Sequence, residues 1–115
     1  MALWEIILRA LSIRQPYLEL ILRGIKKIEY RSRPTLIIGE RFYLYASKMP
    51  GHLEGFEKLG SEPGMLPTGV LLGTAVISKC TGSRSDYEWH LTDVNRLKQP
   101  RTPTKKGQPA WFNPF

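Results

Sequence analysis

A run of apolar residues from 69 to 80 constrains the fold of this chain more than any other feature. Its apolar members are Val70, Leu71, Leu72, Ala75, Val76 and Ile77. A near-continuous apolar run of this length is typical of a strand that is buried on both faces. We therefore predict that these residues form the central strand of a β-sheet.

Shorter patterns on both sides of this run predict further strands. In residues 41–46 the side chains of Phe42, Leu44 and Ala46 fall on one face and two tyrosines on the other. Weaker patterns predict strands at 8–13, 87–91 and 94–97.

Two helices are predicted among these strands. Pro16 suits a first helical position, because its missing N–H is not needed there, and a broad apolar stripe follows it. Gly24 supplies the end of this early helix. A second, short helix is predicted around Leu53, Phe56 and Leu59, inside a loop that is rich in Gly and Pro.

Length and composition predict one domain, residues 1–115, with a variable helical loop at about 48–67. The chain has no run of eighteen apolar residues, and its first residues lack the layout of a signal peptide. We therefore expect a cytoplasmic protein with no membrane partner. The tail from 99 to 115 contains Trp111 and Phe112 and is expected to pack back onto the domain.

The sequence predicts neither a metal ion nor a cofactor. Cys80 is the single cysteine, so it has no partner for an intrachain disulfide, and we expect a small core residue at the end of the apolar run. His52 and His90 are far apart in the sequence, and the acidic residues are scattered without the spacing of metal ligands.

The formal charge of +7 is concentrated at the two ends of the chain. Residues 1–33 carry seven Lys or Arg against three Glu, and residues 94–115 carry five with no acid. The middle, residues 34–93, carries five basic residues against seven acids. If the fold brings the two ends together, they form one positive surface, which attracts polyanions such as nucleic acids.

The segment from 24 to 31 has the pattern of a site. If residues 27–32 form a strand, Glu29 and Arg31 share one face while Ile28 and Tyr30 share the other. Lys26 then lies in the turn before the strand, close to the same charged patch. Such a trio can bind anions or move protons, and the alternative is an ordinary surface salt bridge on a solvated edge strand.

In this order and spacing, five segments of the chain resemble the ASCH domain family, whose barrel is similar to that of PUA domains. They are residues 11–16, the motif Gly24-x-Lys26-x-x-Glu29-x-Arg31, residues 39–47, residues 67–80 and residues 107–111. The resemblance implies an α+β fold: a small, PUA-like, mixed β-barrel of five to six strands with an early helix and a short loop helix.

The resemblance also implies binding of RNA or single-stranded DNA, or of a nucleoside ligand, in a cleft between the early helix and the barrel wall. The residues expected to line this cleft are Ser12, Arg14, Gln15, Lys26, Glu29, Arg31, Ser47 and Lys48. Candidates for stacking on a base are Tyr45, Trp89 and Trp111. A basic surface that follows backbone phosphates is expected from Arg96, Lys98, Arg101, Lys105 and Lys106.

Two alternatives to binding remain open. A small bacterial relative of the family hydrolyses the acetyl group of N4-acetylcytidine with a Lys, a Thr and a later Glu, and other relatives have been proposed as ribonucleases. Lys26 matches that Lys, Glu29 stands in place of the Thr, and Glu88 is a candidate for the later Glu. A hydrolase would then use Glu29 as general base and Lys26 to stabilise an oxyanion. In the other alternative Glu29 bridges Lys26 and Arg31 only to fix the helix against the barrel.

Overall fold

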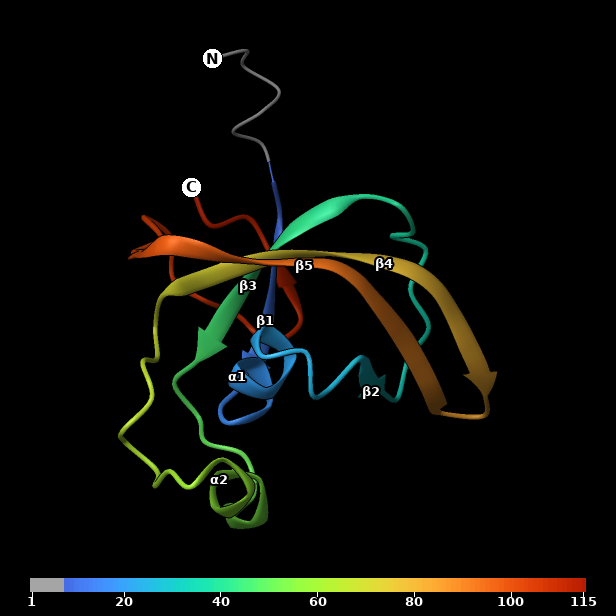
Figure 1. Cartoon of the computed structure of the whole chain (residues 1–115). Coiled ribbons are helices and arrows are strands. Elements are labelled where there is room, and N and C mark those ends of the chain that lie inside the picture. Colours follow the sequence, from blue (N-terminus) through green and yellow to red (C-terminus); the bar gives the residue numbers. More distant parts are fainter. Residues whose placement is uncertain (1–7) are drawn as a thin grey trace.

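The computed structural model describes residues 8–115. The expectation that the first residues lack the layout of a signal peptide lies partly outside this range. The described part of the chain has six strands and two short helices (Figure 1). In chain order they are β1 (Ala10–Arg14), α1 (Tyr17–Leu22), β2 (Ile28–Arg31), β3 (Arg41–Ser47), α2 (Leu53–Leu59), β4 (Leu71–Ser83), β5 (Asp86–Arg101) and β6 (Trp111–Phe112). The predicted α+β fold with an early helix and a short loop helix is confirmed.

The strands form one mixed sheet in the order β2-β5-β4-β3-β1-β6. β1 runs parallel to β3, and the other neighbouring strands are antiparallel. β4 lies between β3 and β5, so the prediction of a central strand is confirmed. Figure 1 shows the long β4–β5 hairpin bending until β2 reaches the side of the sheet on which α1 lies. The sheet curves like a barrel but is not closed, because β2 and β6 are its edges and do not pair with each other.

β3 contributes to the core on both of its faces, as its alternation predicts. Phe42 and Leu44 lie in the larger apolar cluster with residues of β1, α1 and β4, whereas Tyr43 and Tyr45 lie in a smaller cluster with Phe112 of β6. Full burial of one such side chain contributes about 1.5–3 kcal/mol. The carboxyl end of β3 is therefore fixed firmly in place.

The predicted strands at 87–91 and 94–97 are in fact one strand, β5. Thr92 and Asp93 interrupt the apolar pattern, but the chain continues through an irregularity in the β4–β5 ladder, where Asp93 adopts a φ of 50°. A bulge of this kind absorbs an extra residue without ending the strand. β4 likewise continues past Cys80 to Ser83, where the side chains are exposed and leave no apolar signal.

The ends of the elements follow local chemistry. α1 ends before Gly24, whose φ of 76° lies in the left-handed region that glycine adopts at low cost. The tail packs back as expected, because Trp111 and Phe112 of β6 pair with β1. Within residues 8–115, no helix combines the length and apolar character needed to cross a membrane.

Candidate nucleic-acid interface

The charged face of β2 points into the protein rather than into solvent. Glu29 is only 8% exposed, whereas Tyr30 on the opposite face is 64% exposed. β2 is an edge strand that pairs with β5 alone, and Glu29 lies directly opposite the buried Trp89 in that ladder. An apolar residue faces water and a carboxylate is buried, which is the reverse of an ordinary edge strand.

Arg31 ties the open edge of the sheet to β1. Its Nε donates to Oε2 of Glu29 at 2.7 Å, and its Nη2 donates to the carbonyl oxygen of Ser12 at 2.7 Å. The guanidinium also lies over the ring of Trp89, 5.5 Å from its centroid. These contacts fix Arg31 and Glu29 in one geometry, because a planar guanidinium holds its partners by direction as well as by charge.

Lys26 joins the same cluster from the turn before β2. Its Nζ lies 3.7 Å from Oε1 of Glu29 and donates to the carbonyl oxygen of Ile28. Burial lowers the pKa of Lys26 below its ordinary value, and the nearby carboxylate of Glu29 offsets only part of this effect. An ammonium has three N–H donors, so Lys26 keeps hydrogen-bonding capacity for a ligand.

These three side chains line one open cavity of about 1060 Å³. Its walls are the end of β1, the region around β2, the end of β3 with the residues after it, and the segment 102–110 before β6. The cavity is strongly basic: six Lys or Arg side chains line it, against the single acid Glu29. Its basic residues are Arg14, Lys26, Arg31, Lys48, Lys105 and Lys106. Cavities of roughly 300–1000 Å³ accommodate small organic ligands, so this space has the size of a ligand site.

The cavity contains most, but not all, of the residues expected to form the cleft. Its lining includes Ser12, Arg14, Lys26, Glu29, Arg31, Ser47 and Lys48. Gln15 does not line the cavity, and only 2% of it is exposed. Its Nε2 donates to the carbonyl oxygen of Pro67 at 3.0 Å, and its Oε1 accepts from the backbone N–H of Glu19. Gln15 therefore acts within the fold, where it connects α1 to the loop before β4.

Of the three aromatic residues expected to stack on a base, one lines the cavity and two do not. Tyr45 lines the cavity, whereas Trp89 and Trp111 stack on each other in the core with ring centroids 5.9 Å apart. Glu88 does not line the cavity, and Thr81 donates to its carboxylate at 3.2 Å.

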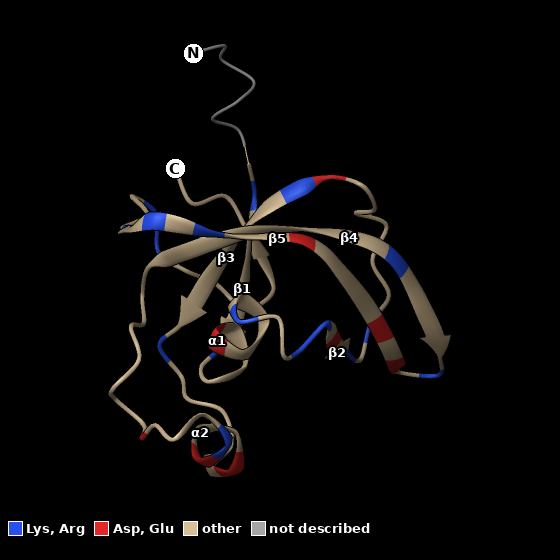
Figure 2. Cartoon of the chain, in the orientation of Figure 1, with Lys and Arg blue, Asp and Glu red and all other residues tan. Residues whose placement is uncertain are grey.

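The expected basic surface is divided between two places. Lys105 and Lys106 line the cavity, whereas Arg96, Lys98 and Arg101 lie on β5 and are not part of the lining. Figure 2 shows that β5 is basic toward its end and acidic toward the β4–β5 hairpin.

Two of the basic residues on β5 are engaged within the protein. Arg101 donates to the hydroxyl of Tyr43 at 2.6 Å and lies over the ring of Phe115. Arg96 forms a two-point ion pair with Glu19, at 3.1 and 2.8 Å.

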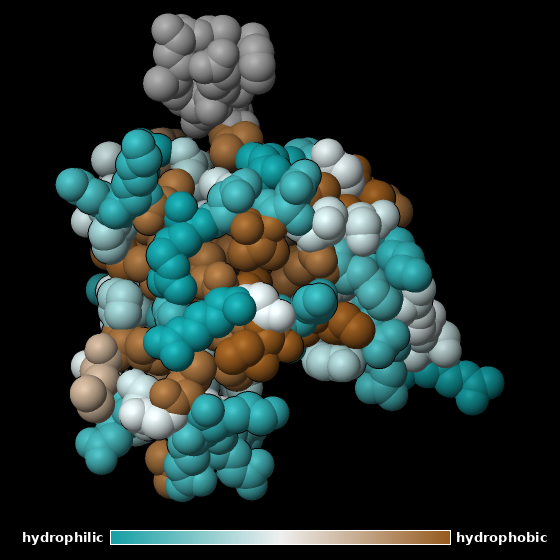
Figure 3. Space-filling model, viewed as in Figure 1, coloured by the Kyte–Doolittle hydropathy of each residue, from teal (hydrophilic) through white to brown (hydrophobic). Residues whose placement is uncertain are grey.

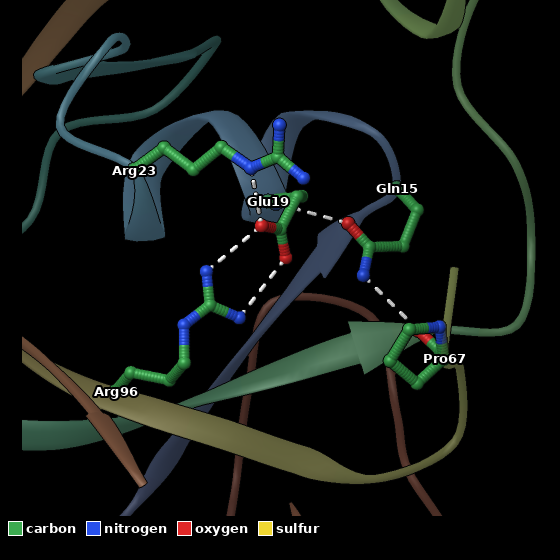
Figure 4. A network of polar contacts seen from close by, with 5 residues as sticks. All are labelled: Gln15, Glu19, Arg23, Pro67 and Arg96. Atoms are coloured by element: carbon green, nitrogen blue, oxygen red, sulfur yellow. Dashed lines mark hydrogen bonds and ion pairs between the residues drawn. The ribbon is translucent and has the colours of Figure 1, made fainter. Parts of the chain in front are cut away.

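The ion pair of Arg96 is part of a network that holds α1 against the sheet (Figure 4). Glu19 is 5% exposed and accepts from both Arg96 of β5 and Arg23, which caps the end of α1. Burial alone would raise the pKa of Glu19. The hydrogen bonds and positive charges of Arg96 and Arg23 outweigh this effect, so the pKa lies below its ordinary value. The network fixes the helix that precedes the motif, and Tyr17 of this helix lines the cavity.

Sequence reasoning missed Tyr30 and His52, both of which line the cavity, and most of the segment 102–110. Ser12 holds that segment: its Oγ donates to the carbonyl oxygen of Gln108 at 2.5 Å, and its N–H donates to that of Ala110 at 2.9 Å. Two lysines of the segment carried a charge signal, but its position beside β1 depends on contacts between the two ends of the chain. Within residues 8–115, no group of three His, Cys, Asp or Glu side chains is placed to hold a metal ion.

Comparison with known proteins identifies the family. A search of curated proteins finds no significant match. The sequence model of the ASCH domain matches residues 11–113, which is nearly the whole chain and includes every wall of the cavity. The protein therefore belongs to the ASCH domain family.

Proposed function

We propose that this protein binds RNA, with one nucleotide held in the basic cavity. ASCH domains have a PUA-like fold and are often proposed to bind RNA. The observation that carries the proposal is the lining of the cavity, where six cations and one buried carboxylate surround a space large enough for a nucleotide. Phosphate groups account for much of the affinity of proteins for nucleic acids, and they require such clustered cations.

The side chains of the cavity can be assigned to different parts of a nucleotide. Lys48, Lys105 and Lys106 are flexible cations that can follow phosphates, whereas Lys26 and Glu29 lie deeper beside the fixed guanidinium of Arg31. Phosphate contacts position a nucleic acid and base contacts provide specificity. Under the proposal, Glu29 accepts from an exocyclic amine of the base and Lys26 donates to a carbonyl or ring nitrogen.

The proposal is tested by salt-dependent binding of a labelled single-stranded RNA, measured by fluorescence anisotropy. Replacing Lys105 and Lys106 by Gln removes two cations that would pair with phosphates. We expect weaker binding for every sequence and a shallower slope of log affinity against log salt, by about 0.7 for each lysine replaced.

The matched control replaces Lys79 and Arg84 by Gln, which removes the same charge outside the cavity. We expect this variant to keep the salt slope of the wild type, because its cations do not reach the ligand. The proposal is wrong if the wild type does not bind RNA at low salt, or if the two double variants lose the same affinity and slope.

A second candidate function is hydrolysis of a modified nucleoside or of RNA. One observation favours it: burial lowers the pKa of Lys26, the residue that would stabilise an oxyanion, and perturbed pKa values are common at active sites. Incubation with N4-acetylcytidine and with RNA, followed by mass spectrometry, tests this candidate. Products that form with the wild type and not with Lys26→Met would support it, and products that persist in the variant would exclude Lys26 from the reaction.

A further inference from the structure

Tyr30 is an exposed aromatic residue at the rim of the cavity. Its side chain is 64% exposed, and Nζ of Lys26 lies 4.8 Å from the centre of its ring. The ammonium occupies one face of the ring, and the exposure leaves other ring surface open to solvent. Phe115, the other exposed aromatic residue in the described part of the chain, is 37% exposed and is covered by Arg101.

A groove of about 1230 Å³ begins at Tyr30 and extends between β2 and α2. It shares Tyr17, Lys26, Tyr30 and His52 with the cavity, so the two spaces are neighbours that meet at these side chains. Figure 3 shows a notch in this part of the molecular surface, between α2 and the β4–β5 hairpin, with apolar atoms at its edge. The exposed ring of Tyr30 therefore lies at the boundary of both spaces, where a strand leaving the cavity would meet it.

The lining of the groove combines apolar and positive surface. Ile25 and Leu53 are each 59% exposed within it. Its charged residues are Lys26, Lys27, Lys58 and Glu54. Sites for single-stranded nucleic acids combine cations that follow the backbone with an aromatic face on which a base stacks. A base in a duplex is already stacked and paired, so it cannot lie on such a ring without leaving the helix.

We infer that the ligand is a single strand of at least two nucleotides, one in the cavity and the next stacked on Tyr30 at the entrance to the groove. This inference depends on the proposed function and extends it, because it specifies the strand form and minimum length of the RNA. The phosphate that follows the stacked nucleotide is directed toward Lys27 and Lys58 of the groove.

Substitutions of Tyr30 test the inference in anisotropy measurements with a single-stranded RNA hexamer and a duplex of the same sequence. Loss of one base–aromatic stack weakens binding by roughly tenfold. We expect this loss in Tyr30→Ala for the single strand, no comparable loss for the duplex, and affinity close to that of the wild type in Tyr30→Phe, which keeps the ring. Phe115→Ala is the control, because it removes an exposed ring outside both spaces.

A base analogue provides a second measurement. The fluorescence of 2-aminopurine falls when it stacks, so a hexamer carrying it at successive positions should be quenched by the wild type at one position and not by Tyr30→Ala. Tyr30 is exposed, and thermal unfolding of each variant checks that its fold is intact. If Lys105→Gln with Lys106→Gln weakens binding but Tyr30→Ala binds and quenches like the wild type, this inference fails and the proposed function stands. If the wild type binds no RNA, both fail.

Discussion

Among single residues, the three charged members of the motif have different roles. Arg31 uses its Nε and Nη2 on Glu29 and on the backbone of β1, so it braces the open side of the sheet. Arg31 therefore has a structural role in addition to lining the cavity. Lys26 differs, because its pKa is lowered by burial and it lies 3.7 Å from a carboxylate whose other oxygen is already paired with Arg31.

The lowered pKa of Lys26 predicts a pH-dependent contribution to RNA binding. The ammonium loses its proton below the ordinary value of 10.5, and the neutral amine no longer attracts an anion. We expect the ratio of wild-type to Lys26→Met affinity to be largest near neutral pH and to fall as the pH rises through the lowered pKa. Anisotropy of both proteins across this range measures the ratio, with Lys79→Met as control. A ratio that stays constant would show that the charge of Lys26 is not used in binding.

At the scale of elements, α1 depends on an ion pair that connects residues 77 positions apart. Arg96 and Arg23 are 47% and 49% exposed, so solvent weakens their attraction to the buried carboxylate of Glu19. We expect Glu19→Gln to lower the free energy of unfolding at pH 7 by about 1–2 kcal/mol. The pKa of Glu19 is lower in the folded state than in the unfolded chain. As the pH falls, the Glu19 carboxylate is therefore protonated in the unfolded chain before it is protonated in the folded protein.

The stabilisation by Glu19 should therefore decrease as the pH falls from about 4.5 through the lowered pKa. Urea unfolding of the wild type and of Glu19→Gln at pH 7 and pH 3 measures the difference. Glu57→Gln, an exposed position on α2, is the control for the general effect of losing one carboxylate. An undiminished difference at pH 3 would contradict the assigned role of the ion pair.

Most elements were predictable because their signals are local. The apolar run of β4, the alternation of β3 and the glycine after α1 each specify a conformation within a few residues. β5 was predicted as two strands, because a bulge at polar residues cannot be distinguished locally from a turn. The Glu19–Arg96 pair and the position of residues 102–110 beside β1 depend on contacts between distant parts of the chain, for which one sequence carries no signal.

At the scale of the whole molecule, the curved sheet brings the two basic ends of the chain to one cavity. Arg14, Lys26 and Arg31 come from the first third of the chain, whereas Lys105 and Lys106 come from the tail. β6 makes this possible, because its pairing with β1 returns the tail to the start of the sheet. The positive charge of the cavity therefore depends on the strand order, because neither end of the chain supplies all of its basic residues.

The most direct test of this account is a titration of ¹⁵N-labelled protein with a single-stranded RNA hexamer, followed by backbone amide shifts in NMR spectra. We predict that the shifted amides cluster at β2, the end of β3 and residues 102–110, which surround the cavity. The exposed loop at 34–40, which does not line the cavity, should be unaffected. Shifts concentrated in that loop, or spectra unchanged by saturating RNA at low salt, would contradict the claim that this cavity binds RNA.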